Sequence, residues 1–206
     1  MSSDPSPIVG IDLGTTRSVI AHVDSTGRAS TIRNSEGDLT TPSVVLVEDD
    51  GVSIGKEALK VAAILPDQVA MLAKREMGKE TYSHAVNGRT YAPELIQSLV
   101  LGKLRRDAET RLGSEVKRAV ITVPAYFDEP KRRSTMDAGS LAGLDVVGII
   151  NEPTAAAIAF GIDALQDEGQ TILVYDLGGG TFDASIVRVE ASEIQVVATD
   201  GNAMLG

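Results

Sequence analysis

The chain has 206 residues, of which 43% are hydrophobic and 23% are charged, and its formal net charge at pH 7 is −10. A chain of this length and apolar content can form one or two compact units. The acidic balance argues against nucleic acid or anionic lipid as a partner, since both need a clustered basic face. There is no cysteine, which excludes disulfides and thiolate metal sites.

The first seven residues, MSSDPSP, have neither the basic start nor the long apolar core of a signal peptide. We therefore expect residues 1–7 to form a disordered tail. No apolar run in the sequence approaches the roughly 20 residues of a membrane-spanning helix. A cytoplasmic protein without membrane association is predicted.

Two distant segments share one plan. IVGIDLGTTRSVIAHV (8–23) and ILVYDLGGGTFDASIV (172–187) each contain an apolar strand, Asp-Leu-Gly, a turn of small residues with Thr, and a second apolar strand. A third candidate strand follows each copy, at 29–32 and at 193–199, so each copy predicts a three-stranded meander. Recurrence of the whole order favours duplication over a chance match, and it indicates two related lobes.

Between the two copies, the sequence first predicts a strand and three helices. Residues 43–47 are expected to form the strand, and 56–64 and 70–77 are expected to form short helices. The longest helix is predicted over 93–112, because its apolar residues recur at i+4 and Gly113 can end it.

From residue 116 onward, strands alternate with helices. The expected strands are 116–123 and 145–150, and the expected helices run from a cap at Asp128 through Gly143 and over 152–162. This alternation indicates an α/β fold in which helices pack on a mixed sheet.

Three consecutive glycines after a strand suggest a phosphate site. Such glycines let backbone N–H groups converge on an anionic oxygen without a Cβ in the way. The adjacent Asp176 would repel a bare phosphate, so a cation such as Mg²⁺ is expected between them, directly or through water. Asp12 precedes a similar turn in the other copy. If the two turns face each other, they can clamp the β- and γ-phosphates of a nucleotide.

Ordinary hairpin turns are the alternative explanation, because Gly and Asp are common in them. Two other phosphate-binding signatures are absent from the sequence. Each Gly-Lys pair is followed by Glu or Leu, which excludes a P-loop, and the G-x-G-x-x-G frame that starts at Gly178 ends at Asp183.

Five motifs, in this order and spacing, resemble the ATPase domain of the Hsp70 (DnaK-type) chaperones in the actin, sugar-kinase and Hsp70 superfamily. They are IVGIDLGTTRSV, LAKREMG (72–78), AVITVPAYFD (119–128), INEPTAAAIAFG (150–161) and VYDLGGGTFD (174–183). The resemblance covers nearly everything after residue 7. A sugar kinase or an actin-like filament protein is a weaker alternative, because neither is expected to combine the third and fourth motifs.

The resemblance implies actin-like (ribonuclease H-like) lobes, with a mixed five-stranded sheet and flanking helices, and a truncated second lobe. It divides the chain into a lobe I core at 8–38 and 114–169, an insertion at 39–113, and the first strands of lobe II at 170–206.

ATP or ADP and Mg²⁺ are the implied cofactors. Asp12 and Asp176 would hold Mg²⁺ through its water shell. Lys74 would be the catalytic lysine, whose ammonium near the γ-phosphate offsets developing charge. Glu152 would lie near the metal and the attacking water. Without the motifs, Lys74 would more simply be a solvated surface charge, and Glu152 a first-turn glutamate that the helix dipole favours.

The remaining roles also follow from the resemblance alone. Asp176 and Thr181 would join Lys74 and Glu152 in catalysis, while Pro124 and Arg132 match a proline switch and its partner arginine, which relay nucleotide state to the surface. A loop proline and an exposed arginine are the alternative. The implied phosphate-binding residues are Gly14, Thr15, Thr16, Gly178, Gly179, Gly180 and Thr181.

The sequence departs from the family at two places. Asn202, Ala203 and Met204 stand where the family usually has an acidic residue, Thr and His, which removes possible metal or phosphate contacts. Arg17 stands where a small polar or aromatic residue is common, and it could approach phosphate or point to solvent. The family segments that grip adenine and ribose are expected beyond residue 206.

Two functional classes stay open. One is a chaperone ATPase domain, of which this segment alone is expected to be weakly active or inactive. The other is a non-catalytic nucleotide-sensing or partner-binding module. The resemblance implies a J-domain co-chaperone, a nucleotide-exchange factor and, through a downstream domain, unfolded client peptides as partners. An exposed apolar face on the second meander would favour a homo-oligomer.

Overall fold

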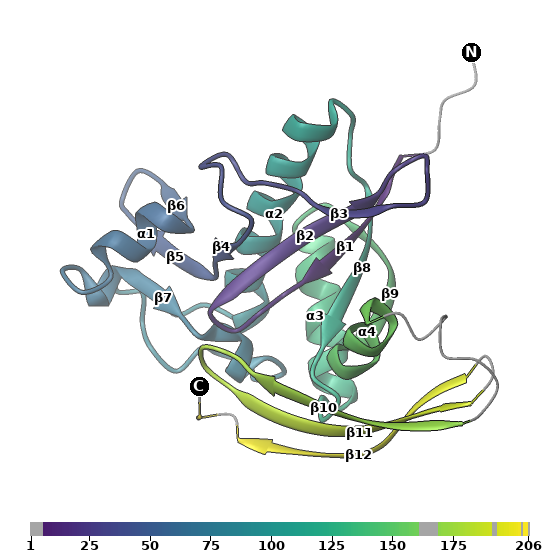
Figure 1. Ribbon diagram of the computed structural model, residues 1–206. Coiled ribbons are helices and arrows are strands. Elements are labelled where there is room, and N and C mark those ends of the chain that lie inside the picture. Colours follow the sequence, from purple (N-terminus) through teal and green to yellow (C-terminus); the bar gives the residue numbers. More distant parts are fainter. Residues whose placement is uncertain (1–5, 161–168, 191–192, 203, 206) are drawn as a thin grey trace.

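The computed structural model describes residues 6–160, 169–190, 193–202 and 204–205. Its largest sheet has the strand order β3-β2-β1-β8-β9, with short β4 paired to the start of β2 (Figure 1). The strands are β1 (Ile8–Asp12), β2 (Arg17–Val23), β3 (Ala29–Thr31), β4 (Thr41–Pro42), β8 (Arg118–Val123) and β9 (Asp145–Asn151). The first three are antiparallel neighbours, whereas β1, β8 and β9 run parallel. The expected mixed sheet is confirmed, and short β4 makes it six-stranded where five strands were predicted.

The main core lies between this sheet and two helices, α2 (Pro93–Leu112) and α3 (Glu129–Leu141). Alternate residues of β1 and β8, such as Val9 and Ile121, are fully buried, as the period of two in a half-covered strand requires. Helix α2 has the predicted bounds and ends at Gly113, which adopts a left-handed φ of 65°. The side chain of Asp128 caps α3 by accepting a hydrogen bond from the Lys131 N–H.

A second sheet, in the order β6-β5-β7, lies beside α2 (Figure 1). Its strands are β5 (Val44–Val47), β6 (Val52–Ile54) and β7 (Val69–Met71). Helix α1 (Lys56–Val61) covers one face, where Ala58 packs against Val44 and Leu46. Two 3₁₀ turns complete this part, η1 (Pro66–Gln68) and η2 (Ala73–Glu76).

The predicted helix over 70–77 is wrong. Residues 69–71 instead pair with β5, because the apolar run is too short to cover a helix face and an open strand edge is available. Leu72 then adopts a left-handed φ of 59°, which interrupts any regular helix before η2. The helix predicted over 56–64 also stops early, at Val61, ahead of Pro66.

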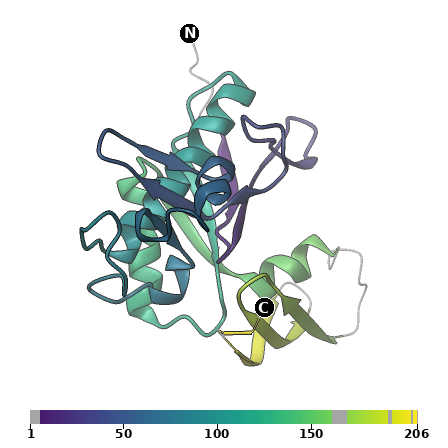
Figure 2. The ribbon, with the colours of Figure 1, turned by 90° about the vertical axis from the view of Figure 1, so that its left-hand side faces the viewer.

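The third sheet is an antiparallel meander in the order β10-β11-β12, as expected. Its strands are β10 (Gln170–Leu177), β11 (Phe182–Glu190) and β12 (Glu193–Asn202). Helix α4 (Glu152–Ala159) contacts strands of both this sheet and the largest one. Figure 2 shows α4 and the third sheet projecting to one side of the body formed by the other two sheets.

One face of the third sheet is covered and the other is exposed. Ala157 of α4 packs against Val187 and Val189 on the covered face. The exposed face carries large apolar side chains, as the sequence predicts for an open meander. They are Leu173, Tyr175, Leu177, Ile186 and Val197.

Some predictions fall on residues outside the described ranges. They concern most of the expected tail at 1–7, the end of the helix expected over 152–162, and Ala203. Ser6 is described, and its hydroxyl bonds to the backbone of Glu115 and Lys117 at 2.9 and 3.1 Å. No helix in the described part of the chain is long and apolar enough to cross a membrane.

Two glycines in helices test the packing of the main core. A Cβ on Gly139 of α3 would collide with the side chain of Val146 in β9, whereas a Cβ on Gly102 of α2 would meet only the mobile end of Arg106, at 3.3 Å. We expect Gly139→Ala to lower the free energy of unfolding by about 1–3 kcal/mol, because an overpacked core must shift. Gly102→Ala should instead raise it by up to ~1 kcal/mol. Urea denaturation measures both, and equal stability of the two variants would contradict this packing.

Candidate functional site

The two Asp-Leu-Gly turns meet. The first joins β1 to β2, and the second joins β10 to β11. A Cβ added to Gly179 would lie 2.6 Å from Thr16 Oγ1, and one added to Gly180 would lie 3.1 Å from Thr15 Cγ2. The backbone of the second turn therefore lies directly against the threonines of the first, an approach that only glycine permits.

A serine that the sequence analysis missed holds the first turn in shape. The hydroxyl of Ser43, just before β5, donates to the Gly14 carbonyl at 2.8 Å, and its N–H donates to the Thr16 carbonyl at 2.9 Å. Gly14 is itself required by this tight path, because a Cβ there would collide with the Arg17 carbonyl. Ser43 lies 27 residues beyond Thr16, and nothing in the local pattern indicates the contact.

A cleft of about 280 Å³ opens between the two turns. All the predicted catalytic, phosphate-binding and metal-binding residues line it, whereas Pro124 and Arg132 do not. Two further lining residues, Arg17 and Val19, come from β2. The full lining consists of Asp12, Gly14, Thr15, Thr16, Arg17, Val19, Lys74, Glu152, Asp176, Gly178, Gly179, Gly180 and Thr181.

Acidic side chains gather in this cleft from three elements. Asp12 ends β1, Asp176 lies near the end of β10, and Glu152 begins α4. Asp12 is oriented by the Thr122 hydroxyl, which donates to Oδ1 at 2.8 Å. Burial and the neighbouring Asp12 raise the pKa of Asp176, while Lys74 partly offsets them. This crowding of negative charge fits a site for a hard divalent cation.

The described residues contain no cluster of three or more His, Cys, Asp or Glu side chains with metal-binding geometry. Asp12 and Asp176 could thus supply only part of a coordination shell. Mg²⁺ commonly keeps several waters and binds one or two carboxylates together with substrate phosphates. The two aspartates and the glycine cradle fit that mode of binding.

A buried ion pair forms part of the cleft lining. Lys74 Nζ lies 2.5 Å from Glu152 Oε1, and the two side chains are only 6% and 17% exposed. The alternative of a solvated Lys74 is therefore excluded. Burial raises the pKa of Glu152; Lys74 opposes this, and Asp12 and Asp176 add to it. Lys74 comes from η2 and Glu152 from the first turn of α4, so the pair joins two elements distant in sequence.

Two more charged residues near the cleft were missed. Arg75, next to Lys74, donates a hydrogen bond from Nη2 to the Gly180 carbonyl and so ties η2 to the second turn. Asp183 has a buried Oδ1 without a hydrogen-bond partner among the described residues. Burial and the nearby Asp176 raise the pKa of Asp183. Asp183 closes the VYDLGGGTFD motif, which was a usable signal, whereas nothing distinguished Arg75 from a surface arginine.

Pro124 and Arg132 lie outside the cleft, but a chain of contacts connects them to it. Arg132 donates from Nη2 to Asn151 Oδ1 at 2.6 Å, and Asn151 immediately precedes Glu152. Arg132 Nε donates to the Phe127 carbonyl at 2.9 Å, and the Phe127 N–H donates to the Pro124 carbonyl at 3.1 Å. Arg132 is thus half-buried and bonded, which excludes a freely exposed arginine.

Two of the departures near the end of the chain, Asn202 and Met204, do not reach the site. Asn202 pairs with Phe182 at the end of β12, and its Oδ1 accepts a hydrogen bond from the Met204 N–H at 2.8 Å. Both Asn202 and Met204 are exposed, and neither lines the cleft. Arg17, in contrast, does line it.

Removing the lysine of the buried pair should make stability depend on pH. In Lys74→Met, burial and the two aspartates keep the folded-state pKa of Glu152 above its unfolded value, and the lysine that opposed them is gone. The contribution of protonated Glu152 to the stability of the variant is therefore fully present below the unfolded pKa of about 4.3. This contribution is lost as pH rises through the folded-state pKa of Glu152. We expect the deficit relative to the unmodified chain to be about 3 kcal/mol at pH 8 and smaller at pH 5.

Urea denaturation at the two pH values measures this deficit. The matched variant Lys74→Met/Glu152→Gln lacks the Glu152 carboxyl, so its stability should change less between pH 5 and pH 8 than that of Lys74→Met. A Lys74→Met deficit that is the same at pH 5 and pH 8 would show that Glu152 is not the uncompensated charge.

Comparison with known proteins gives one consistent result. The family model described as "Hsp70 protein" matches residues 8–87 and 79–206. The chain is 49% identical over 199 residues to "Chaperone protein DnaK" of Halobacterium salinarum, covering 97% of this chain and 31% of that protein. It is 47% identical over 207 residues to the DnaK of Thermosipho melanesiensis and 48% over 200 residues to that of Thermotoga neapolitana, covering 34% and 33% of their lengths.

The chain therefore spans about a third of the length of the curated relatives that it matches. The match covers 97% or more of the chain itself in each case. With its mixed sheet, its paired glycine turns and these relatives, the chain belongs to the Hsp70 family.

Proposed function

We propose that this chain binds the phosphates of Mg-ATP and Mg-ADP between its two glycine turns and, as part of a longer Hsp70-type chaperone, hydrolyses ATP. One observation carries the proposal: two turns 164 residues apart in sequence lie in contact around a cleft that holds carboxylates and a buried lysine. An ordinary hairpin turn needs no such partner.

In this proposal each side chain has a stated task. Backbone N–H groups of the turns at 14–16 and 178–180 donate to phosphate oxygens. Asp12 and Asp176 hold the hydrated Mg²⁺, which when bound neutralises charge between phosphates and carboxylates. Lys74, fixed by Glu152 Oε1, directs its remaining N–H donors toward the γ-phosphate.

The attacking water also needs an orienting group. Glu152 Oε2 is left to accept a hydrogen bond from that water, since Oε1 is engaged by Lys74. The hydroxyl of Thr181, which also lines the cleft, would contact the γ-phosphate or the same water. These contacts act by positioning and charge stabilisation, which supply most of the catalysis in phosphoryl transfer.

The contacts from Glu152 through Asn151 and Arg132 to Pro124 support a relay of nucleotide state. We propose that this relay serves the longer protein, together with a J-domain co-chaperone, a nucleotide-exchange factor and client peptides bound by a further domain. We also propose that 8–38 with 114–169, the insertion 39–113, and 170–206 act as separate units. A cytoplasmic location and a homo-oligomer through the exposed third sheet stay predictions.

Isothermal titration of Mg-ATP and Mg-ADP into this chain tests the proposal. We expect binding that requires the metal and that Asp176→Asn abolishes. Lys74→Met should bind within a few-fold of the unmodified chain, because the turns supply most phosphate contacts.

Hydrolysis is measured after joining the chain to the C-terminal two-thirds of the Thermotoga neapolitana relative. There, Lys74→Met should lower kcat by about 100-fold or more. Absence of nucleotide binding in both the chain and its extended form would reject the proposal and leave a partner-binding module as the function.

A further inference from the structure

We propose that Arg17 is a phosphate-binding side chain particular to this protein, which grips the inner phosphates of the nucleotide at the mouth of the cleft. The inference rests on the proposed function and deepens it. It adds a side chain to a site whose other phosphate contacts come mainly from backbone N–H groups.

The position of Arg17 supports the proposal. It is the first residue of β2, directly after Gly14, Thr15 and Thr16, and it lines the cleft. It is exposed, whereas Lys74 is buried beside Glu152. If the reacting γ-phosphate binds beside buried Lys74, as proposed, the phosphates nearer the nucleoside would lie toward the exposed part of the lining, which includes Arg17.

The balance of charges that line the cleft supports a role for this arginine. Three carboxylates and two cations line it among the described residues. Lys74 is already paired with Glu152, and the two aspartates are the candidates to hold Mg²⁺. Of the two cations that line the cleft, Lys74 has a carboxylate partner, whereas Arg17 has none in the described part of the chain. It can therefore offset phosphate charge that Lys74 and the metal leave over.

The guanidinium of Arg17 is held by one hydrogen bond and still has N–H donors available to a ligand. Its Nη1 donates to Thr40 Oγ1 at 3.2 Å. Guanidinium has five N–H donors in a planar fork, so most of them remain available to a phosphate. A side chain held in place before binding loses less conformational entropy when it binds.

Thr40 is itself fixed by a buried asparagine in the loop at 33–40. Asn34 Nδ2 donates to the Thr40 carbonyl and to Thr41 Oγ1, both at 3.2 Å. Asn34 Oδ1 accepts a hydrogen bond from the Asp38 N–H at 2.8 Å. The loop is thus closed on itself around a side chain that is 3% exposed.

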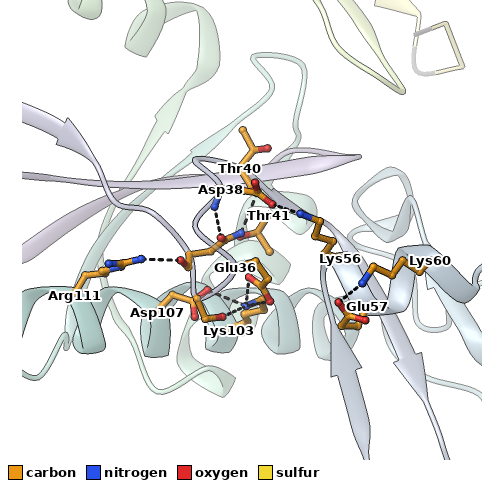
Figure 3. A network of polar contacts seen from close by, with 12 residues as sticks. Glu36, Asp38, Thr40, Thr41, Lys56, Glu57, Lys60, Lys103, Asp107 and Arg111 are labelled. Carbon is orange, nitrogen blue, oxygen red and sulfur yellow. Dashed lines mark hydrogen bonds and ion pairs between the residues drawn. The ribbon is translucent and has the colours of Figure 1, made fainter.

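Helix α2 anchors the same loop from below, as Figure 3 shows. The ammonium of buried Lys103 lies 3.0 Å from carboxylate oxygens of both Glu36 and Asp107 and donates to Ser35 Oγ at 3.0 Å. The Asn34 carbonyl also accepts a hydrogen bond from Arg111 at 3.4 Å. A network that begins in the core of the lobe therefore ends at the residue that holds Arg17.

The neighbouring arginine of this loop provides a matched control. Arg33 is exposed, and its Nη1 donates to the Gly37 carbonyl at 2.8 Å. Arg33 and Arg17 line the same adjoining hollow, but Arg33 does not line the phosphate cleft. Loss of either arginine changes the net charge of the chain equally, so only a direct role separates them.

The test is titration calorimetry of Mg-ADP and Mg-ATP into the chain carrying Arg17→Gln or Arg33→Gln. We expect Arg17→Gln to weaken both nucleotides about tenfold, the usual effect of one charge-assisted hydrogen bond, and to reduce the salt dependence of binding. Arg33→Gln should stay within twofold of the unmodified chain. Arg17→Lys should recover part of the loss, because a point charge replaces a fork.

Phosphorus NMR then locates the contact. Arg17→Gln should alter the binding-induced shifts of the α- and β-phosphates more than that of the γ-phosphate. Metal-dependent binding by the unmodified chain that Arg17→Gln leaves within twofold would overturn the role of Arg17 alone. An equal loss of nucleotide affinity in Arg17→Gln and Arg33→Gln would overturn a direct contact, because it would show that only the net charge of the chain matters. No binding by either the unmodified chain or its extended form would overturn this inference together with the proposed function.

Discussion

A lysine ammonium buried against a glutamate carboxylate is the interaction on which the rest of this structure depends. The pair of Lys74 and Glu152 joins the 3₁₀ turn after β7 to the first turn of α4, and α4 in turn covers the third sheet. Charges buried in this way are costly unless they are paired. The pair therefore links the segment after β7 to the helix that contacts both the largest and the third sheet, next to Asp12 and Asp176.

Glycine determines the other side of the same cleft. The second turn can lie against Thr15 and Thr16 only because Gly179 and Gly180 have no Cβ. The resulting cradle is lined by backbone N–H donors, which attract a phosphate, and by carboxylates, which repel it. A bound cation such as Mg²⁺ would let both kinds of group face the same phosphates. Arg17 adds a positively charged side chain to the lining of this cleft.

The turns and the strands that flank them could be predicted from the sequence because the pattern within each copy of the repeat is local. The Asp-Leu-Gly turns, the helix at 93–112 and the cap at Asp128 each depend on neighbours within a few residues, and the structure has all of them. The helix expected over 70–77 failed because strand pairing with β5 outweighed a weak local preference. Ser43 and Arg75 escaped notice because their contacts depend on tertiary folding.

The roles of the site residues follow from the family resemblance, whereas their proximity follows from the fold. A crystal structure of the chain with Mg-ADP tests the account most directly. We expect the diphosphate between Gly14–Thr16 and Gly178–Gly180, with Mg²⁺ within one water of Asp12 and Asp176. A diphosphate bound elsewhere, with the two glycine turns apart or empty, would contradict it.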